Sequence, residues 1–329
     1  MSERIITYAE AIREAIGQAM ESDPTVFMLG EDIGVYGGAF GVSGDLYHRF
    51  GEERVRDTPI SEMGIVGAAV GAALVGMKPI VEIQFSDFTA HAMDQIVNQA
   101  AKIHFMLGGE LSVPMVLRAP SGSGTGAAAQ HSQSLEAWFA HVPGLKVVMP
   151  SSPADAKGLL LSALDDPNPV IVLEHKLLYK TSGHVPPEMY RTPIGKSNLV
   201  RDGKDLTIVA TGVMVSRSLE AAAELASQGI DAAVIDVRTL SPLDMDPINE
   251  SVSKTGRLML VQEAPKHVGF MAEIAARVSE GPGIYHLSEP IKRLCGMDVP
   301  IPYAPQLEKS VVPQLPEIIG SAADLMRGV

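Results

Sequence analysis

Cysteine is almost absent from this sequence, which restricts how the chain can be cross-linked. Cys295 is the one cysteine among 329 residues. An intrachain disulfide and a cysteine-rich zinc site are therefore excluded, as is usual in a reducing compartment. We expect Cys295 to be a buried small hydrophobic residue rather than a reactive thiol.

Dense positive charge is also missing. The formal net charge is -13, and Lys and Arg form no dense run. This balance argues against a surface that tracks nucleic acid phosphates or binds anionic lipid, and we expect no nucleic acid partner. A basic protein partner is compatible with it.

Long apolar segments are missing as well. The longest weakly polar run, Gly64 to Met77, is well short of the roughly 20 residues that span a bilayer, so no membrane segment is expected. Met1 to Ala11 contains no apolar signal core, and Glu3 and Glu10 are atypical of a transit peptide. These features predict a cytoplasmic protein.

The nine histidines show neither His-Glu-x-x-His nor another metal-ligand spacing. We therefore expect no catalytic transition metal. Any enzymatic chemistry has to come from other side chains or from an organic cofactor.

The composition is that of a soluble globular protein with more than one domain. Hydrophobic residues make up 46% and charged residues 20% of the chain. Single domains usually contain about 100 to 200 residues, so this length predicts two. Residues 181–200 hold Pro186, Pro187 and Pro193 without clear periodicity, which indicates an exposed connector. We predict domains over 1–185 and 201–329, with 186–200 as the linker.

Strand and helix patterns alternate in both predicted domains. A capping box of Thr7 and Glu10 opens an amphipathic helix that stops at Asp23. Buried strands are expected at Val26–Leu29, Ile80–Ile83, Val113–Leu117, Val147–Met149, Val170–Leu173, Leu206–Ala210, Ala232–Val237 and Leu258–Val261. Further helices are expected at Gly64–Gly76, His91–Met106, Pro153–Leu164, Val215–Ser227, Phe270–Val278 and Leu315–Met326. The alternation predicts two doubly wound α/β domains, the second one smaller.

Glu62 is the first residue with potential chemistry. It lies on a turn, in Asp57-Thr58-Pro59-Ile60-Ser61-Glu62, directly before a helix of Gly, Ala and Val. A carboxylate in a first helical turn often does no more than complement the helix dipole. The alternative is a desolvated carboxylate that holds or shares a proton.

A glycine-rich loop, Ser121-Gly122-Ser123-Gly124-Thr125-Gly126, follows a predicted strand and leads to His131. Its spacing satisfies a loose dinucleotide fingerprint, but no helix begins at once, and a nicotinamide-dependent dehydrogenase is therefore only a minor alternative. A loop that presents His131 is the other interpretation, and a structural histidine is the third.

Several motifs together resemble the beta subunits of thiamine-diphosphate-dependent 2-oxo acid dehydrogenases. The resemblance covers essentially the whole chain. It is carried by Leu29-Gly30-Glu31-Asp32, Asp57-Thr58-Pro59 through Glu62, Ala129-Gln130-His131-Ser132-Gln133, Pro143 to Val148, and Ile301-Pro302-Tyr303. It implies a pyrimidine-binding transketolase-like domain followed by a transketolase C-terminal-like domain.

The resemblance also implies roles for individual residues. Glu62 would hydrogen-bond the pyrimidine ring of thiamine diphosphate, with Phe88 packed on that ring and Gln84 and His91 nearby. His131 would face the thiazolium and donate a proton as the lipoyl disulfide is reductively acylated. In several members a structural potassium ion is held, largely through backbone carbonyls, by the positions corresponding to Met115, Ala163, Leu164, Asp166 and Asn168.

The Gly-Asp-Gly strand end that binds magnesium and the diphosphate is missing, since the chain has only Asp202-Gly203 in a polar turn. The resemblance therefore implies an alpha subunit that supplies this half, with magnesium on the alpha side, in an alpha2beta2 heterotetramer. Lipoyl and peripheral-subunit-binding domains of an acyltransferase core would be further partners.

The predicted function is oxidative decarboxylation of a 2-oxo acid with acyl transfer to a lipoyl domain. Pyruvate is preferred as substrate, which corresponds to EC 1.2.4.1, with acetoin second and branched-chain 2-oxo acids third. Two alternatives come from other classes of protein: a non-catalytic assembly subunit that docks the acyltransferase core, and a self-contained transketolase-like enzyme.

Overall fold

The computed structural model describes residues 4–328, so residues 1–3 of the segment inspected for targeting signals lie outside it. The chain forms two compact units. The first comprises the residues up to Ser121 together with Trp138–Ile194, and the second comprises Gly122–Ala137 together with the residues from Gly195 onward. The segment Gly122–Ala137, which carries His131, therefore groups with the second unit, whereas a linear division counts it in the first.

The first unit is built on a parallel sheet. Its strands lie in the order β6-β7-β5-β4-β2-β3, and every adjacent pair among them is parallel. Their bounds are Val26–Gly30 (β2), Val55–Asp57 (β3), Lys78–Glu82 (β4), Val116–Ser121 (β5), Lys146–Val148 (β6) and Val170–His175 (β7). The predicted parallel sheet is thus confirmed, although Val113–Leu117 was placed three residues too early. Pro114 has no N–H to donate, and the N–H of Met115 bonds to Val113.

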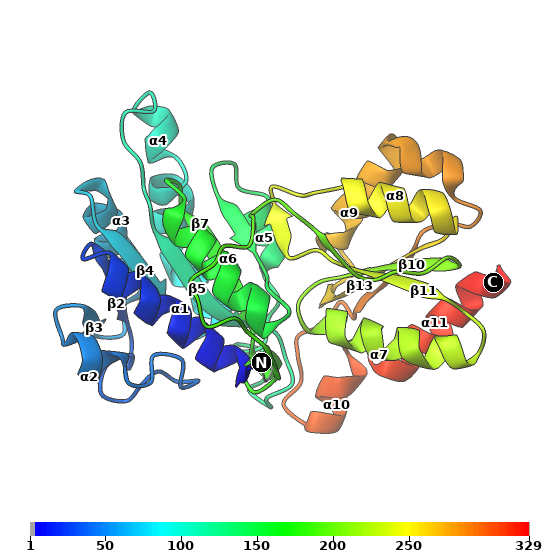
Figure 1. Cartoon of the computed structure of the whole chain (residues 1–329), viewed down its shortest axis with the longest axis horizontal. Helices are drawn as coiled ribbons and strands as arrows, with labels where there is room; N and C mark the ends of the chain where they lie inside the picture. Colours follow the sequence, from blue (N-terminus) through cyan, green and yellow to red (C-terminus); the bar gives the residue numbers. More distant parts are fainter. Residues whose placement is uncertain (1–3, 329) are drawn as a thin grey trace. The chain divides into compact units, whose positions relative to one another are not determined.

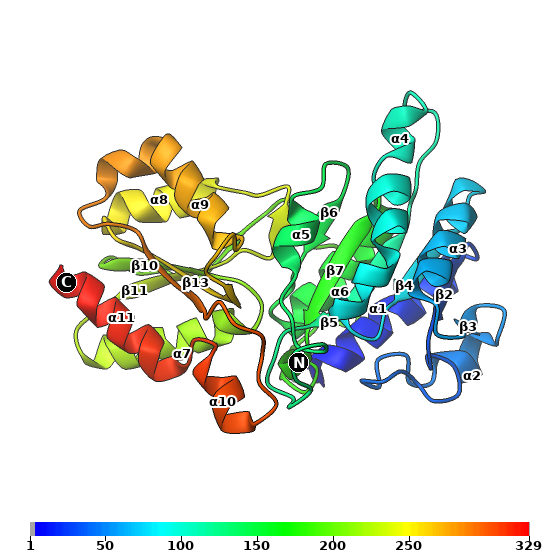
Figure 2. The ribbon, with the colours of Figure 1, turned by 180° about the vertical axis from the view of Figure 1, so that it is seen from behind.

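Helices cover both faces of this sheet. Helix α1 (Tyr8–Ser22) opens with the predicted Thr7–Glu10 capping box and packs along α6 (Pro153–Asp165), which has Ser152 as its N-cap. Figure 1 shows these two helices together on one face, and Figure 2 shows α3 (Glu62–Leu74) and the segment leading to α4 (Ile103–Met106) on the other. A short helix α2 (Leu46–Phe50) precedes β3.

The helix predicted over His91–Met106 was wrong as a single element. The chain instead forms a 3-10 segment η1 (Ser86–Ala92), a π-helical segment η2 (Asp94–Ala100) and the short α4. Ala92, Ile96 and Ala100 are still buried. The apolar periodicity therefore fixed which side faces the core, but it does not distinguish the three kinds of helical hydrogen bonding.

The segment predicted as an exposed connector is bound to the first unit up to Ile194. Strand β8 (Ser182–His184) pairs antiparallel with β1 (Ile5–Thr7). The fully buried Lys157 donates to the carbonyls of Pro186 and Pro187 at 2.8 and 3.2 Å and pairs with Glu14 at 2.6 Å. These contacts compensate for the burial of the ammonium group, which composition alone did not reveal.

The second unit contains a sheet in the order β14-β13-β10-β11-β9, parallel except for β9 against β11. The strands are β9 (Asn198–Arg201), β10 (Leu206–Ala210), β11 (Ala232–Asp236), β13 (Leu258–Pro265) and β14 (Lys292–Gly296); Thr239–Ser241 is the short β12. Figure 1 shows α8 (Asp246–Thr255) and α9 (Met271–Glu280) on one face of this sheet, and α7 (Val213–Ser227) and α11 (Leu315–Arg327) on the other. Remaining short helices are η3 (Lys176–Leu178), α5 (Glu136–Ala140), η4 (Pro282–His286) and α10 (Pro305–Ser310).

Cys295 lies in β14 and is partly rather than fully buried. Burial raises the pKa of its thiol to about 11. The thiol therefore stays protonated near neutral pH, as expected of an unreactive cysteine.

Candidate functional site

Three neighbouring parallel strands of the first unit end side by side. Gly30, the last residue of β2, is in register with Asp57 at the end of β3 and with Glu82 at the end of β4. Polar residues that follow such strand ends gather at the same edge of the sheet. Glu31 directly follows β2, Gln84 lies two residues after the end of β4, and Glu62 opens α3, the next element after β3.

Glu62 lies at the start of α3 and is 7% exposed. One of its carboxylate oxygens is 3.2 Å from Nδ1 of His91, whose side chain is 64% exposed. The His91 ring stacks on Phe88, with centroids 5.9 Å apart and an interplanar angle of 19°. Three of the predicted cofactor-binding side chains are therefore in contact: His91 lies between the buried Glu62 and the partly exposed ring of Phe88.

Glu31 belongs to the Leu29-Gly30-Glu31-Asp32 motif, but the sequence predicted no role for it. Burial, the nearby charge of Glu62 and that of Asp32 raise its pKa, although a hydrogen bond from the Ser61 N–H opposes the shift. Gln84 donates to Asp32 at 3.2 Å, and Asp32 has a left-handed φ of 55°. Glu62 and Glu31 thus form a pair of buried carboxylates that lie close enough for the charge of Glu62 to raise the pKa of Glu31.

A row of aromatic rings lies beside this pair. Phe85 contacts Phe88 and Phe40 edge to face, at 5.9 and 5.7 Å between centroids, and Phe40 stacks on Tyr179 at 5.2 Å. Such a row presents flat apolar faces of the kind that a planar heterocycle contacts.

A buried ionic network supports the row from within the sheet. The fully buried Arg118 donates to Glu174 through Nε and to Glu82 through a terminal nitrogen, at 2.7 and 2.6 Å, and the Tyr179 hydroxyl donates to Glu174 at 2.7 Å. Burial alone would lower the pKa of Arg118, but the two carboxylates raise it above its ordinary value. The guanidinium is therefore permanently charged, and the Glu174 carboxylate that it holds also accepts the hydrogen bond of Tyr179.

The residues of the first unit fit the aminopyrimidine end of thiamine diphosphate. A buried carboxylate is the group that can hold a protonated ring nitrogen, and the adjacent rings provide a stacking face. Glu62, His91 and Phe88 meet this requirement by their contacts. Gln84 bonds to Asp32, beside the carboxylate pair, so its contacts support a cofactor-binding role less directly.

His131 belongs to the second unit, in the glycine-rich loop. Its N–H bonds to Ala128 at 3.2 Å. The N–H groups of Ser123 and Gly124 are taken by the carboxylates of Glu263 and Glu308, at 2.5 and 2.7 Å. Internal carboxylates therefore occupy donors that a dinucleotide phosphate would need, and the nucleotide alternative loses its support.

Glu136, in the second unit, is another acid to which the sequence assigned no role. Burial, more than the charge of Glu263, raises its pKa to about 7. One of its carboxylate oxygens is buried without a hydrogen-bond partner among the described residues. Such an oxygen favours the neutral, protonated carboxyl.

Of the residues predicted to hold potassium, Asp166 contacts Ala163 and Asn168, while Met115 bonds to Val170, two residues after Asn168. The carbonyls of Ala163 and Met115 accept backbone N–H groups of Asp166 and Val170, at 3.3 and 3.0 Å. The Asp166 carboxylate pairs with Lys146 and accepts the N–H of Asn168. The carbonyls keep a second lone pair for a cation, whereas the carboxylate is already neutralised.

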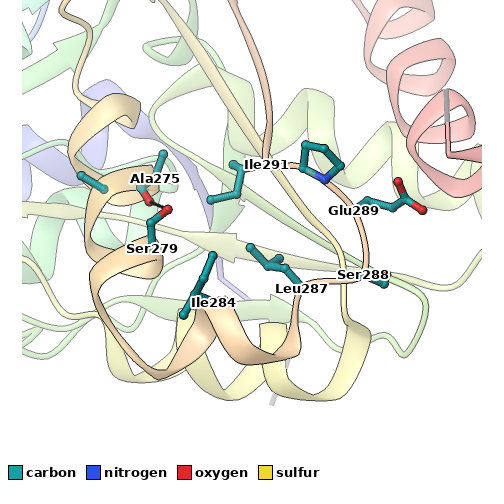
Figure 3. Close-up of a pocket in the computed structure, with 9 residues that line it drawn as sticks. Ala275, Ser279, Ile284, Leu287, Ser288, Glu289 and Ile291 are labelled. Carbon is teal, nitrogen blue, oxygen red and sulfur yellow. Dashed lines mark hydrogen bonds between the residues drawn. The ribbon is translucent and has the colours of Figure 1, made fainter.

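A pocket of about 510 Å³ lies elsewhere in the second unit, between α9 and residues 284–291 (Figure 3). Its lining is mainly apolar, with Ile284, Leu287 and Ile291, and Glu289 is its one titratable side chain. None of the predicted site residues lines it. Within residues 4–328 no three His, Cys, Asp or Glu side chains are placed to hold a metal ion, and no helix has the length and hydropathy to cross a membrane.

The sequence did not single out Glu31, Glu136, Glu263 or Glu308. For Glu31 a signal existed, because it directly follows a buried strand. The other three lie far from their partners in the sequence, so that only the fold reveals them.

Comparison with known proteins agrees with this architecture. Residues 4–182 match the transketolase pyrimidine binding domain, and residues 195–318 match the transketolase C-terminal domain. The fold is similar to that of a split-gene transketolase described as an inactive beta4 tetramer, with a TM-score of 0.80, 23% identity and coverage of 98% of this chain and 99% of that one.

Close relatives in sequence are beta subunits. The chain is 49% identical to the beta subunit of acetoin:2,6-dichlorophenolindophenol oxidoreductase of Cupriavidus necator, over 97% of this chain and 96% of the relative. It is 48% identical to the 2-oxoisovalerate dehydrogenase subunit beta of Bacillus subtilis (93% and 94%), and 45% identical to the human mitochondrial pyruvate dehydrogenase E1 component subunit beta (95% and 89%). The chain belongs to the family of 2-oxo acid dehydrogenase beta subunits, and the predicted two-domain α/β fold is confirmed.

Removing the charge of Glu136 should stabilise the protein at high pH. Because the native pKa of about 7 lies above the ordinary 4.5, the folded state binds more protons between these values, and wild-type stability falls as the pH rises through this window. Glu136→Gln lacks this loss. Its free energy of unfolding, from urea titrations, should exceed the wild-type value by up to about 3 kcal/mol at pH 8, and the gain should fade towards pH 4.5.

The matched control is Glu224→Gln, which removes an exposed charge from α7. Its difference from wild type should stay flat with pH. A flat difference for Glu136→Gln as well would show that this carboxyl titrates normally.

Proposed function

We propose that this chain is the beta subunit of the decarboxylating component of a 2-oxo acid dehydrogenase complex, and that it binds the aminopyrimidine of thiamine diphosphate. The observation that carries the proposal is the buried Glu62, placed against His91 and Phe88 at a shared edge of parallel strands. Family membership supports it.

When bound, thiamine diphosphate supplies a carbanion that attacks the keto carbon of the substrate and stores the electron pair released with carbon dioxide. Glu62 would hold a proton at the pyrimidine nitrogen, with Glu31, whose pKa is raised, beside it. Phe88 would orient the ring, with His91 and Gln84 at its border. His131 would donate a proton during transfer of the acyl group to a lipoyl domain.

An alpha subunit is the proposed partner in an alpha2beta2 assembly, with magnesium and the diphosphate bound on the alpha side. Large apolar side chains are exposed on the first unit, including Ile60 at 82% and Phe105 at 86%, with Met63 and Met106 also above half. Surfaces of this kind mark protein interfaces. Lipoyl and peripheral-subunit-binding domains complete the proposed set of partners, and the proposed location is the cytoplasm.

Pyruvate remains the proposed substrate, with acetoin and branched-chain 2-oxo acids as the alternatives. Relatives named for each of the three are between 45% and 49% identical, so identity does not rank them. Turnover of the assembled complex, measured on each substrate in turn, would rank them. A preference for another substrate would replace pyruvate in the proposal.

Glu62→Gln should reduce turnover of the reconstituted alpha–beta complex by about 100-fold or more, because the amide cannot exchange a proton with the ring nitrogen. Reduction of an artificial electron acceptor measures it. The control Glu52→Gln removes an exposed carboxylate and should leave turnover unchanged. Wild-type turnover in Glu62→Gln would support the alternative that the chain is a non-catalytic assembly subunit.

Thiamine diphosphate with magnesium should bind the mixture of alpha and beta chains but not the beta chain alone, since the diphosphate motif is missing from this sequence. Isothermal titration calorimetry on each sample measures this. Tight binding to the isolated beta chain would contradict the half-site and favour a self-contained transketolase-like enzyme.

The proposal retains a potassium ion at Met115, Ala163, Leu164, Asp166 and Asn168, supported by the backbone carbonyls of Met115 and Ala163. Potassium chloride should then raise the melting temperature by a few degrees over sodium chloride at equal ionic strength, because a ligand of the native state stabilises it. Equal melting temperatures in the two salts would remove the ion from the proposal.

A further inference from the structure

The loop that carries His131 has an unusual backbone. Gly122, Gly124, Gly126 and Ala128 all have positive φ values, of 85°, 101°, 69° and 62°. The N–H of Gly122 bonds to the carbonyl of Gln133 at 3.1 Å and closes the loop. Glycine visits many other conformations at little cost, so contacts from outside the loop must select this one.

Two carboxylates from distant segments of the second unit supply those contacts. Glu308 accepts the N–H of Gly124 at 2.7 Å and that of Gly126 at 3.2 Å. Glu263 accepts the N–H of Ser123 at 2.5 Å and the hydroxyl of Ser134 at 3.4 Å. Backbone N–H groups in alternating conformations form a concave anion site, and here the anions belong to the chain itself.

Glu308 stands out within its own helix. It is 3% exposed, while the other five residues of α10 are exposed. Among the described residues, the hydrogen bonds of its side chain all come from the glycine-rich loop. A buried carboxylate is costly unless charged hydrogen bonds compensate it, so α10 and the loop depend on this contact.

We infer that Glu308 is a positioning residue for His131. Its carboxylate fixes Gly124 and Gly126, and the turn from Ala128 to His131 then starts from a defined point, so that the imidazole is presented in one orientation. The inference rests on the proposed function, in which His131 donates a proton during acylation of the lipoyl domain. The Ile301-Pro302-Tyr303 segment, just before α10, would then serve as the connection that positions Glu308.

The test uses the reconstituted alpha–beta complex with a lipoyl domain and compares Glu308→Gln, Glu308→Asp, His131→Ala and the double variant. Gln keeps the shape but turns an amide towards backbone donors, and Asp keeps the charge but is one methylene shorter.

Acylation of the lipoyl domain should fall about tenfold or more in Glu308→Gln and less in Glu308→Asp. Reduction of an artificial acceptor, which bypasses the lipoyl group, should change less than threefold. The double variant should be no slower than His131→Ala, because both changes remove one function.

Amide hydrogen exchange of residues 122–133 gives a readout that does not depend on activity. Exchange should accelerate in Glu308→Gln and remain as in wild type in Glu280→Gln, which removes an exposed carboxylate at the end of α9. Unchanged loop exchange, or additive losses in the double variant, would overturn the inference. Full lipoyl acylation by His131→Ala would instead refute the role of His131 in the proposed function, while accelerated exchange in Glu308→Gln would still show that the carboxylate holds the loop.

Discussion

The parallel register of β3, β2 and β4 is the constraint on which the chemistry of the first unit depends. It sets Asp57, Gly30 and Glu82 side by side, so that the chain leaves three adjacent strands at one edge. A carbon atom added to Gly30 would come within 2.6 Å of the Glu82 carbonyl. The strands therefore approach too closely there for any side chain. Glu31, the next residue along the chain, is buried near enough to Glu62 for the charge of Glu62 to raise its pKa.

Burying Glu31 and Glu62 costs free energy, which interactions elsewhere in the unit have to offset. Arg118, Glu82 and Glu174 form a fully enclosed ionic group beneath the aromatic row. Burial raises the pKa of Glu82 despite the neighbouring guanidinium of Arg118. Protonation of Glu82 would change the net charge of this buried group. Removal of Arg118 would leave two buried carboxylates unpaired, a situation that typically costs about 3–5 kcal/mol. Tyr179 is held by the same group through its hydrogen bond to Glu174, and Phe40 stacks on its ring.

The sequence predicted this architecture well where periodicity and capping act locally. The Thr7–Glu10 capping box, the helix at Pro153–Leu164 and the strand at Leu206–Ala210 were all recovered, because each depends on residues a few positions apart. The helix at His91–Met106 failed, since apolar spacing does not fix the hydrogen-bond type. Among the predicted site residues, Glu62 and His91 were proposed from a motif resemblance. Their contact joins residues 29 positions apart, and only the fold reveals it.

The glycine-rich loop shows why a short pattern is weak evidence. The same alternation of glycines that would cradle a phosphate instead receives Glu308 and Glu263, which lie 184 and 140 positions away from their partners. Nothing in the loop itself tells these two cases apart, because the N–H groups and the left-handed residues are the same in both. The difference lies in the charge that the rest of the chain brings to the loop. An anion held internally is fixed by covalent connection and excludes a soluble competitor, so this loop is a structural support for His131 rather than a ligand site.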